Sequence, residues 1–504
     1  MRGGVDPQTE GVLDVWPTAI HLFLLARSTS TFRGRLGGAN RTMSDFETGM
    51  WRMEEAQPQL RSPIVAVEVL DRAPPDWDRL LDAVEWASHV VPRIRMRAVE
   101  PAMQLGNPVW SVDPEFDIGY HLRRVRLPAP ADFDHALRMC RHLATEPFDK
   151  ARPPWSALLI EGLDDGRAVF VVKTHHSITD GMGGIQMMTL LHSRRPDPTP
   201  NKPDRTPPAP EHLSSVGAFG EEVVSEIRRA PSRIAKLVRG ATNVATTAIS
   251  SPITTASEVL GYANSLRKIV TPPARSGSPL LHDRGLGRWF GTLEVGVPEL
   301  KAGAKAAGGS LNDAYVAALL GGFHRYHEAF GQSVDSIPMG MPISMRTGAD
   351  ANGGNRFAAV RFNGPVSETD PAKRIRQVRE IVLSLREEPA LDAIDVAAPI
   401  LARLPNYLLA NWYLSQSTGL DLQASNVAGV PVPVYLAGAK IERMFPFGPA
   451  PGCAAMATLV SHVGVCCIGI NLDTAAITKP ALLMQCLQES LDEIVALGVT
   501  TEGA

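Results

Sequence analysis

Hydrophobic and polar residues alternate along this chain in a pattern that predicts two αβ regions. In the first region, strands are expected at residues 64–70, 96–99, 157–161 and 168–173, and helices at 75–91 and 132–144. In the second, strands are expected at 293–297, 337–345, 356–362 and twice within 454–472, and helices at 298–307, 310–329 and 480–497. Strands that alternate with helices are typical of an α/β (α+β) fold.

The stretch between the two regions has a different composition. Residues 196–210 contain seven prolines and almost no apolar side chains, which predicts an extended, semi-rigid crossover. Residues 221–244 follow as an amphipathic helix that is kinked or broken at Pro231 and carries basic residues beside apolar ones. This composition is typical of a helix at a lipid surface, but a helix packed across the two regions would show the same pattern.

Four segments follow from these patterns. Residues 1–42 lack the helical or strand periodicity that would anchor them in a core, and the second methionine, Met43, resembles a natural start, so this extension is expected to be dispensable. Residues 43–195 are expected to form a first half and residues 286–504 a second half. Residues 196–285 hold the proline-rich linker and the amphipathic helices between them.

The composition excludes several classes of protein. Of the 504 residues, 44% are hydrophobic and 20% charged, and the formal net charge is −3, so a large core is possible and nothing attracts nucleic acid in general. The sequence has no uninterrupted apolar run long enough for a membrane-spanning helix. The five cysteines form neither a disulfide framework nor a Cys-x-x-Cys zinc motif. A cytoplasmic protein without a bound metal is therefore expected.

One string, Lys173 to Gly184 (KTHHSITDGMGG), carries the most specific chemistry. It follows an apolar strand and precedes an apolar-periodic helix. Two adjacent histidines, an aspartate four residues later and a cluster of glycines at a helix start are not a pattern of core residues. The string therefore marks a candidate active site.

Several interpretations of this string compete. The histidines could be turn residues while Asp180 caps the helix. A shared metal is disfavoured because adjacent residues on an extended chain point to opposite sides, and a nucleophilic Ser177 lacks the Gly-x-Ser-x-Gly elbow. A general base, in which one imidazole takes a proton from an acceptor hydroxyl, agrees best with the pattern.

The string His-His-x-x-x-Asp-Gly resembles the active-site signature of coenzyme A-dependent acyltransferases. The rest of the chain is similar to one branch, the bacterial wax ester synthase / diacylglycerol acyltransferase family, through RPPW at 152–155, LND at 311–313, PISMR at 342–346, GNR at 354–356 and SNVAG at 425–429. Two positions depart from the family pattern, because Pro154 replaces a leucine and Ala428 replaces a proline. Ser461-His462 also stands where the family often has Ser-Tyr, and His462 is expected to be structural.

The resemblance implies two chloramphenicol-acetyltransferase-like halves, joined by the long proline-rich crossover, that enclose a tunnel. An alcohol would enter from one mouth and acyl-coenzyme A from the other. His176 would be the general base, which takes the alcohol proton and later protonates the leaving thiolate, and His175 would support the loop. No cofactor and no metal are implied, since acyl-coenzyme A is a co-substrate.

The remaining site residues are also assigned through the resemblance. Asp180 is expected to structure the loop by pairing with Arg346. Gly181, Asn312, Ser425 and Asn426 are expected near the substrates. For Asn312 two roles stay open, stabilisation of the oxyanion and capping of the helix.

The expected function is transfer of a fatty acyl group to diacylglycerol, which makes triacylglycerol, or to a long-chain alcohol, which makes a wax ester. Two alternatives remain. One is a non-catalytic lipid-binding homologue at storage-lipid surfaces, and the other is a condensation-type enzyme that takes its acyl group from a carrier protein. The partners expected are acyl-coenzyme A, a lipid alcohol and the surface of the inner membrane face or of lipid droplets, without nucleic acid.

Overall fold

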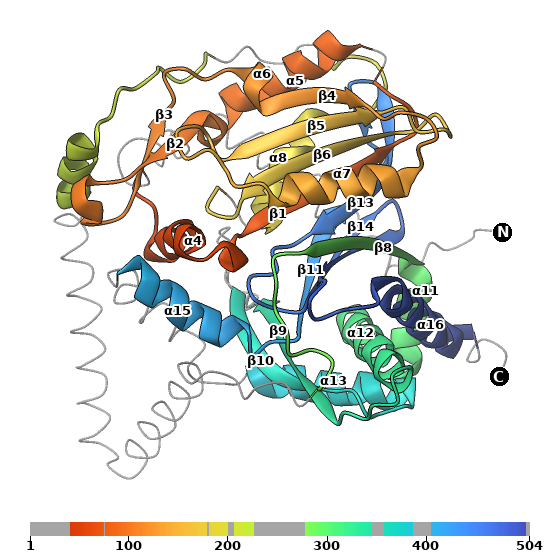
Figure 1. The fold of residues 1–504 in the computed structure, drawn as a ribbon. Coiled ribbons are helices and arrows are strands. Elements are labelled where there is room, and N and C mark those ends of the chain that lie inside the picture. Colours follow the sequence, from red (N-terminus) through yellow and green to blue (C-terminus); the bar gives the residue numbers. More distant parts are fainter. Residues whose placement is uncertain are drawn as a thin grey trace, which may run out of the picture.

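Two large β-sheets and the helices that cover them make up the computed structural model (Figure 1). It describes residues 41–74, 76–178, 181–199, 206–225, 278–344, 357–386 and 405–499. The α/β fold class predicted from the sequence is confirmed.

The first sheet has seven strands in the order β4-β5-β6-β1-β13-β12-β7. Their bounds are β1 (Pro63–Leu70), β4 (Leu122–Arg126), β5 (Trp155–Glu161), β6 (Ala168–His175), β7 (His192–Ser193), β12 (Tyr435–Leu436) and β13 (Ala439–Phe447). β4 and β5 are parallel, and the other neighbours are antiparallel. A separate ribbon of β2 (Met96–Val99) and β3 (Val109–Val112) lies beside this sheet.

Helices cover both faces of the first sheet because its strands alternate between two apolar sides. Phe170 and Val172 of β6 pack with Val84 of α5 (Trp77–Val90) and with α8 (Gly181–Leu191). Val169 and Val171 point the other way, into the core under α7 (Phe133–Thr145). The other helices of this region are α4 (Asp45–Ala56), α6 (Ile118–His121), η1 (Pro58–Leu60), η2 (Pro92–Arg95) and η3 (Ala102–Gln104).

The second sheet has six strands in the order β10-β9-β11-β14-β15-β8. Their bounds are β8 (Arg288–Gly296), β9 (Ser336–Ser344), β10 (Phe357–Pro365), β11 (Leu422–Val430), β14 (Ala455–His462) and β15 (Val465–Asp473). The largest apolar core lies between these strands and α11 (Val297–Ala306), α12 (Leu311–Glu328), α13 (Pro371–Arg386) and α16 (Pro480–Val499). A further helix, α15 (Asn406–Ser417), packs against α4.

The two predicted halves share strands. β13 belongs to the second half in sequence, but it pairs with β1 of the first half along most of its length. At Gly469 of β15 an added Cβ atom would lie 1.9 Å from the carbonyl oxygen of Pro446 in β13, so only glycine allows this approach. The first and second halves are therefore joined by main-chain hydrogen bonds within the first sheet. The segment boundaries themselves stay predictions.

Most strands and helices expected from the pattern are present within a few residues. Val297 is an exception, because it begins α11 rather than ending β8, as expected when Pro298 occupies the first helical turn. The predicted helix at 221–244 is described only as far as residue 225, and it begins earlier, at residue 215. The predicted extension lies outside the described residues except for Arg41 and Thr42, which contact β3.

Candidate active site

The histidine string lies where β6 ends in a turn before α8 (Figure 1). Neighbouring strands hold this end on both sides. The backbone N–H of His175 donates to the carbonyl of Pro154 at 2.9 Å, and that of His176 donates to the carbonyl of Ser62 at 3.1 Å. The RPPW motif and the start of β1 therefore fix the histidine loop.

His175 is fully buried, with a polar group near each ring nitrogen. Nδ1 lies 3.1 Å from the backbone nitrogen of Ser177 and 2.7 Å from its hydroxyl. Nε2 lies 3.3 Å from Oε2 of Glu54, a charge contact without hydrogen-bond geometry. Trp51 and Phe148 make T-shaped contacts with the ring. Because it is fully buried among these groups, His175 can orient the loop but cannot reach a substrate hydroxyl.

Glu54 is the charged partner of His175. Burial favours the neutral form of this carboxyl, but the contact with His175 and the positive charges of Lys150 and Arg61 outweigh burial and hold the pKa of Glu54 below its usual value. Glu54 is therefore ionised at neutral pH. Its contact with Nε2 favours the His175 tautomer in which Nε2 carries the proton and Nδ1 accepts from the Ser177 amide.

His176 differs from its neighbour in exposure. It is the first residue of the turn and is partly exposed, whereas His175 is fully buried. The residues on either side of the turn, Thr174 and Ile178, line one pocket. His176 thus lies in sequence between two residues that line the pocket, and it is the more exposed of the two histidines.

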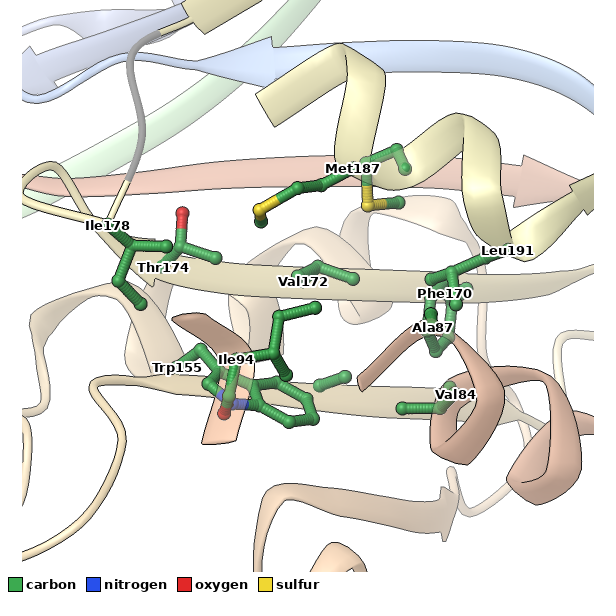
Figure 2. A pocket seen from close by; sticks show the side chains of 12 residues that line it. Val84, Ala87, Ile94, Trp155, Phe170, Val172, Thr174, Ile178, Met187 and Leu191 are labelled. Carbon is green, nitrogen blue, oxygen red and sulfur yellow. The ribbon is translucent and has the colours of Figure 1, made fainter. Parts of the chain in front are cut away.

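This pocket, called the apolar pocket below, has a cavity volume of about 40 Å³ and lies between β5, β6, α5 and α8 (Figure 2). Figure 2 shows Val172 and Phe170 on its floor, with Trp155, Val84 and Met187 around them. The oxygen of Thr174 lies at the end nearest the histidine turn. An almost entirely hydrocarbon lining next to the histidine turn matches an alkyl group in polarity.

Trp155, the last residue of the RPPW motif, is a fixed wall of the apolar pocket. Its Nε1–H donates to the carbonyl of Ile94 at 2.7 Å, and the His121 ring stacks on it with 4.5 Å between centroids. Nδ1 of His121 also lies 2.8 Å from the Trp155 carbonyl. The pocket residues were not predicted from the sequence, although the alternation of Phe170, Val172 and Thr174 before the histidines was the signal that could have shown them.

The structure brings some of the other predicted residues towards this loop. Gly181 is the first residue of α8, and α8 contacts β11, which carries Ser425 and Asn426. Asn426 is exposed and Ser425 partly so. The predicted pair of Asp180 and Arg346 lies outside the described residues.

Asn312 lies in the first turn of α12, and one of its two predicted roles is wrong. Ser310 caps this helix, with the Asp313 amide donating to its hydroxyl at 3.3 Å and the Asp313 carboxylate accepting from the Ser310 amide at 2.8 Å. A reciprocal capping box leaves no capping role for Asn312. Among the described residues, none of the recorded hydrogen bonds joins Asn312 to the histidine loop, so the oxyanion role stays a prediction.

His462 is a buried structural residue. Its ring nitrogens lie 3.0 Å from the carbonyl oxygen of Val430 and 3.1 Å from that of Ile441. Burial lowers the pKa of His462, although these two carbonyls oppose that effect. The residue links β14 to β11 and β13, as the structural interpretation of the sequence expected.

Comparison with known proteins gives the family. Residues 43–315 match the family model described as wax ester synthase/diacylglycerol acyltransferase catalytic domain, and residues 353–495 match the WS/DGAT C-terminal domain. A Mycobacterium tuberculosis protein named "Putative diacyglycerol O-acyltransferase" is 39% identical over 445 residues, which are 88% of this chain and 89% of that protein. Another protein of the same name and organism is 26% identical over 406 residues, 78% of each chain.

Solved structures agree with this fold. The wax ester synthase/diacylglycerol acyltransferase of Marinobacter aquaeolei VT8 matches with a TM-score of 0.59 and 19% identity, over 91% of this chain and 99% of that one. The first condensation domain of the calcium-dependent antibiotic synthetase matches with a TM-score of 0.57 and 14% identity, over 91% and 96%. The histidine loop, the fold and the two matched family models lead to one conclusion: the chain belongs to the wax ester synthase/diacylglycerol acyltransferase family of acyltransferases.

Proposed function

We propose that this enzyme transfers a fatty acyl group from acyl-coenzyme A to diacylglycerol, forming triacylglycerol, and that it also accepts long-chain alcohols. The name of the 39%-identical relative supports diacylglycerol as the acceptor. The family description, which includes wax ester synthases, supports long-chain alcohols as second acceptors. No cofactor is required, because acyl-coenzyme A itself brings the activated acyl group.

In the proposed reaction His176 removes the proton from the acceptor hydroxyl as the oxygen attacks the thioester carbonyl. The tetrahedral intermediate then collapses, the carbon–sulfur bond breaks, and the imidazolium returns the proton to the leaving thiolate. The products are an ester and free coenzyme A, so no acyl-enzyme and no net proton are needed. A positioned base of this kind contributes roughly 10²- to 10⁴-fold in rate.

The contrast between the two histidines carries this proposal. His175 is fully buried with its ring nitrogens beside Ser177 and Glu54, while His176 is partly exposed between two residues of the apolar pocket. An alkyl chain in that pocket would place its reactive end at His176 and not at His175. The pocket is therefore the proposed site of a substrate chain.

The test is an assay of the purified full chain with labelled acyl-coenzyme A and a panel of acceptors that contains diacylglycerol, a long-chain alcohol and no acceptor. Labelled triacylglycerol with turnover would support the proposal. Binding of labelled lipid without any ester product would favour the non-catalytic homologue instead. Ester formation only when the acyl group is supplied on a carrier protein would favour a condensation-type donor.

Peripheral attachment to a lipid surface is part of the proposal. No helix among the described residues is both long and apolar enough to cross a membrane. In the helix at 215–225, Ala218 packs on Val99 and Val109, while Val216, Phe219 and Val223 are exposed to 72%, 38% and 41%. These three lie at the spacing of one helical face, and an exposed apolar face of this kind supports contact with lipid.

Flotation of the full chain with liposomes tests this attachment. Replacing Val216, Phe219 and Val223 by serine should reduce the floated fraction several-fold. A second variant replaces the five basic residues at 228, 229, 233, 236 and 239 by glutamine. Its flotation with vesicles that contain anionic lipid measures how much these charges contribute to binding. Unchanged flotation of both variants would remove this helix from the proposal.

A further inference from the structure

A second pocket lies between the two halves and is not explained by the apolar pocket or by the base. It has a cavity volume of about 220 Å³. Its walls include Arg61 and Thr145 from the first half, and Arg288 and Asn471 from the second. It is called the arginine pocket below.

Within the described residues, each guanidinium group of the arginine pocket makes one hydrogen bond. Arg61 donates to the carbonyl of Thr145 at 3.1 Å, and Arg288 donates to that of Ala450 at 3.0 Å. A guanidinium carries five N–H donors, so these bonds use a small part of the capacity of each side chain. Nη1 of Arg288 is buried and makes no hydrogen bond within the described residues.

Acidic side chains balance part of this positive charge. Oδ2 of Asp473 lies 3.9 Å from Nη1 of Arg288, beyond hydrogen-bonding distance, and its two oxygens accept from the Gly285 and Ala475 amides instead. The negative charge of Glu54 interacts electrostatically with Arg61, but Glu54 also contacts His175. The arginine pocket thus has two positive groups whose acidic neighbours are engaged elsewhere, which suits a phosphate oxygen.

Asn471 adds an acceptor to the same wall. It is buried, its Nδ2 donates to the carbonyl of Gly448 at 3.0 Å, and within the described residues its buried Oδ1 has no hydrogen-bond partner. An unpaired buried amide oxygen costs free energy unless a bound molecule supplies an N–H or O–H group. The arginine pocket therefore fits a ligand that carries both phosphates and amide or hydroxyl donors.

The arginine pocket lies next to the histidine loop. Pro63 lines it and is the strand partner of His175, which places the two Cα atoms about 5 Å apart. The preceding residue, Ser62, accepts the His176 amide. The apolar pocket meets the same loop at Thr174 and Ile178, so both pockets border the loop that carries His176.

We propose that the arginine pocket binds the phosphate-bearing arm of the acyl donor, with Arg61 and Arg288 as its phosphate ligands. This assignment rests on the proposed function and names the place of one substrate within it. An acyl-coenzyme A molecule is apolar on one side of its thioester and carries amides and phosphates on the other. One pocket with an almost wholly hydrocarbon lining and one that carries two arginines, both bordering the same loop, match that division.

Calorimetric titration of the full chain with free coenzyme A tests the assignment without any reaction. Arg61→Gln and Arg288→Gln should each weaken coenzyme A binding about tenfold, the loss expected for one charged hydrogen bond. Arg167→Gln is the matched control, because Arg167 pairs with Asp165 at the opposite end of β6. The melting temperature of each variant shows whether it is folded.

A second measurement locates the effect on the donor. With acyl-coenzyme A, the two variants should raise KM about tenfold with little change in kcat, because the arginines bind the donor away from the reacting atoms. With an acyl-N-acetylcysteamine thioester, which lacks the phosphates, KM should match that of the wild type. Arg61→Lys and Arg288→Lys should recover part of the binding, since they keep the charge.

The outcomes separate this assignment from the proposed function. Folded glutamine variants that bind coenzyme A as tightly as the wild type would overturn the assignment, even if the enzyme makes triacylglycerol. Weaker binding to phosphatidic acid vesicles with unchanged coenzyme A binding would overturn it too, because the phosphate would then belong to a lipid headgroup. If the arginines prove necessary for coenzyme A binding but no acceptor is acylated, the proposed function fails and the assignment stands.

Discussion

Each of the two sheets contains four neighbouring strands that pair in the same parallel and antiparallel order. The two sheets differ instead in the residues at their strand ends. In the first sheet the run is β4-β5-β6-β1, and in the second it is β11-β14-β15-β8. In each run the first pair of strands is parallel and the next two pairs are antiparallel. In each, a helix follows the third strand along the chain, α8 after β6 and α16 after β15.

The residues at the two strand ends differ in chemistry. β6 ends at His175 with His176 following, and β15 ends at Asp473. His176 is partly exposed beside the apolar pocket, whereas Asp473 is buried and accepts from the amides of Gly285 and Ala475. The same topology thus carries a partly exposed histidine after the strand end of one sheet and a buried aspartate that holds a turn at the strand end of the other.

The largest effect is expected when the proposed base after the end of β6, His176, is removed. His176→Ala should lower kcat at least roughly 100-fold, because a positioned general base contributes on the order of 10²–10⁴ in rate. The melting temperature should stay almost unchanged, since this side chain is partly exposed. Steady-state assays with labelled acyl-coenzyme A and differential scanning fluorimetry measure both quantities.

His175→Ala is the control for that variant and should do the reverse. It removes a buried ring from between Trp51 and Phe148 and leaves Glu54 without its partner, so the melting temperature should fall while the folded fraction keeps measurable activity. If His176→Ala kept wild-type turnover, or His175→Ala lost more turnover per folded molecule, the base would be assigned to the wrong histidine.

The strand end of the second sheet should show a loss of stability. Asp473→Ala leaves the amides of Gly285 and Ala475 without their acceptor, at 2.8 and 2.9 Å in the wild type. Loss of a buried carboxylate with two such bonds should cost about 3 kcal/mol of unfolding free energy. Urea denaturation measures this loss. The kcat of the folded enzyme should remain within about twofold of the wild type, because Asp473 acts on no reacting atom. A kcat loss comparable with that of His176→Ala would show that both strand ends are catalytic.

Filling the apolar pocket should change substrate preference. Ala87 of α5 lines this pocket, so Ala87→Leu should lower kcat/KM for long-chain relative to short-chain substrates about tenfold, the usual range for a few methylenes. Ala136→Leu in α7 is the matched control, because it is equally buried under the opposite face of the sheet. A chain-length profile that shifts equally in both variants would show that the apolar pocket does not hold the chain.

A smaller effect concerns the pH dependence of stability at the first strand end. Because the pKa of Glu54 is lowered in the folded state, its ionised form stabilises the protein at pH values above the unfolded pKa of 4.5. This contribution should disappear as pH falls through the lower, folded pKa. The difference in melting temperature between wild type and Glu54→Gln should therefore be constant above about pH 5 and shrink in more acid solution. A difference that grows on acidification would contradict the sign.

The smallest change is expected from a chain that begins at Met43. Such a chain should fold and keep its activity, although it loses the ion pair of Arg41 with Glu211 and the bridge between Thr42 and Val109. Because the ion pair is partly exposed, its loss should lower stability by at most about 1 kcal/mol. Activity assays and thermal unfolding of the two chains side by side are the measurement, and insoluble or inactive shortened enzyme would contradict the expectation.

Local patterns were sufficient for much of the fold. The alternating run at 168–173 and the periodic segment at 480–497 each predicted the element that is present, since their apolar sides already match one strand face or one helix stripe. The sequence left open whether Asn312 caps α12, and only the reciprocal hydrogen bonds of Ser310 and Asp313 settled which residue does so. β13 was not predicted, because a strand with polar and charged positions needs its partner, β1, to become recognisable.

The sequence by itself determined that His175, His176 and Asp180 form an acyltransferase signature, because this information resides in residue types at fixed spacing. Only the tertiary structure decided that His175 is enclosed by Trp51, Phe148 and Glu54. It also decided that Arg61 and Arg288, 227 positions apart in the sequence, line one pocket beside that loop. The physical reason is that burial, pairing and pockets depend on which distant strands lie side by side, and no local pattern contains that information.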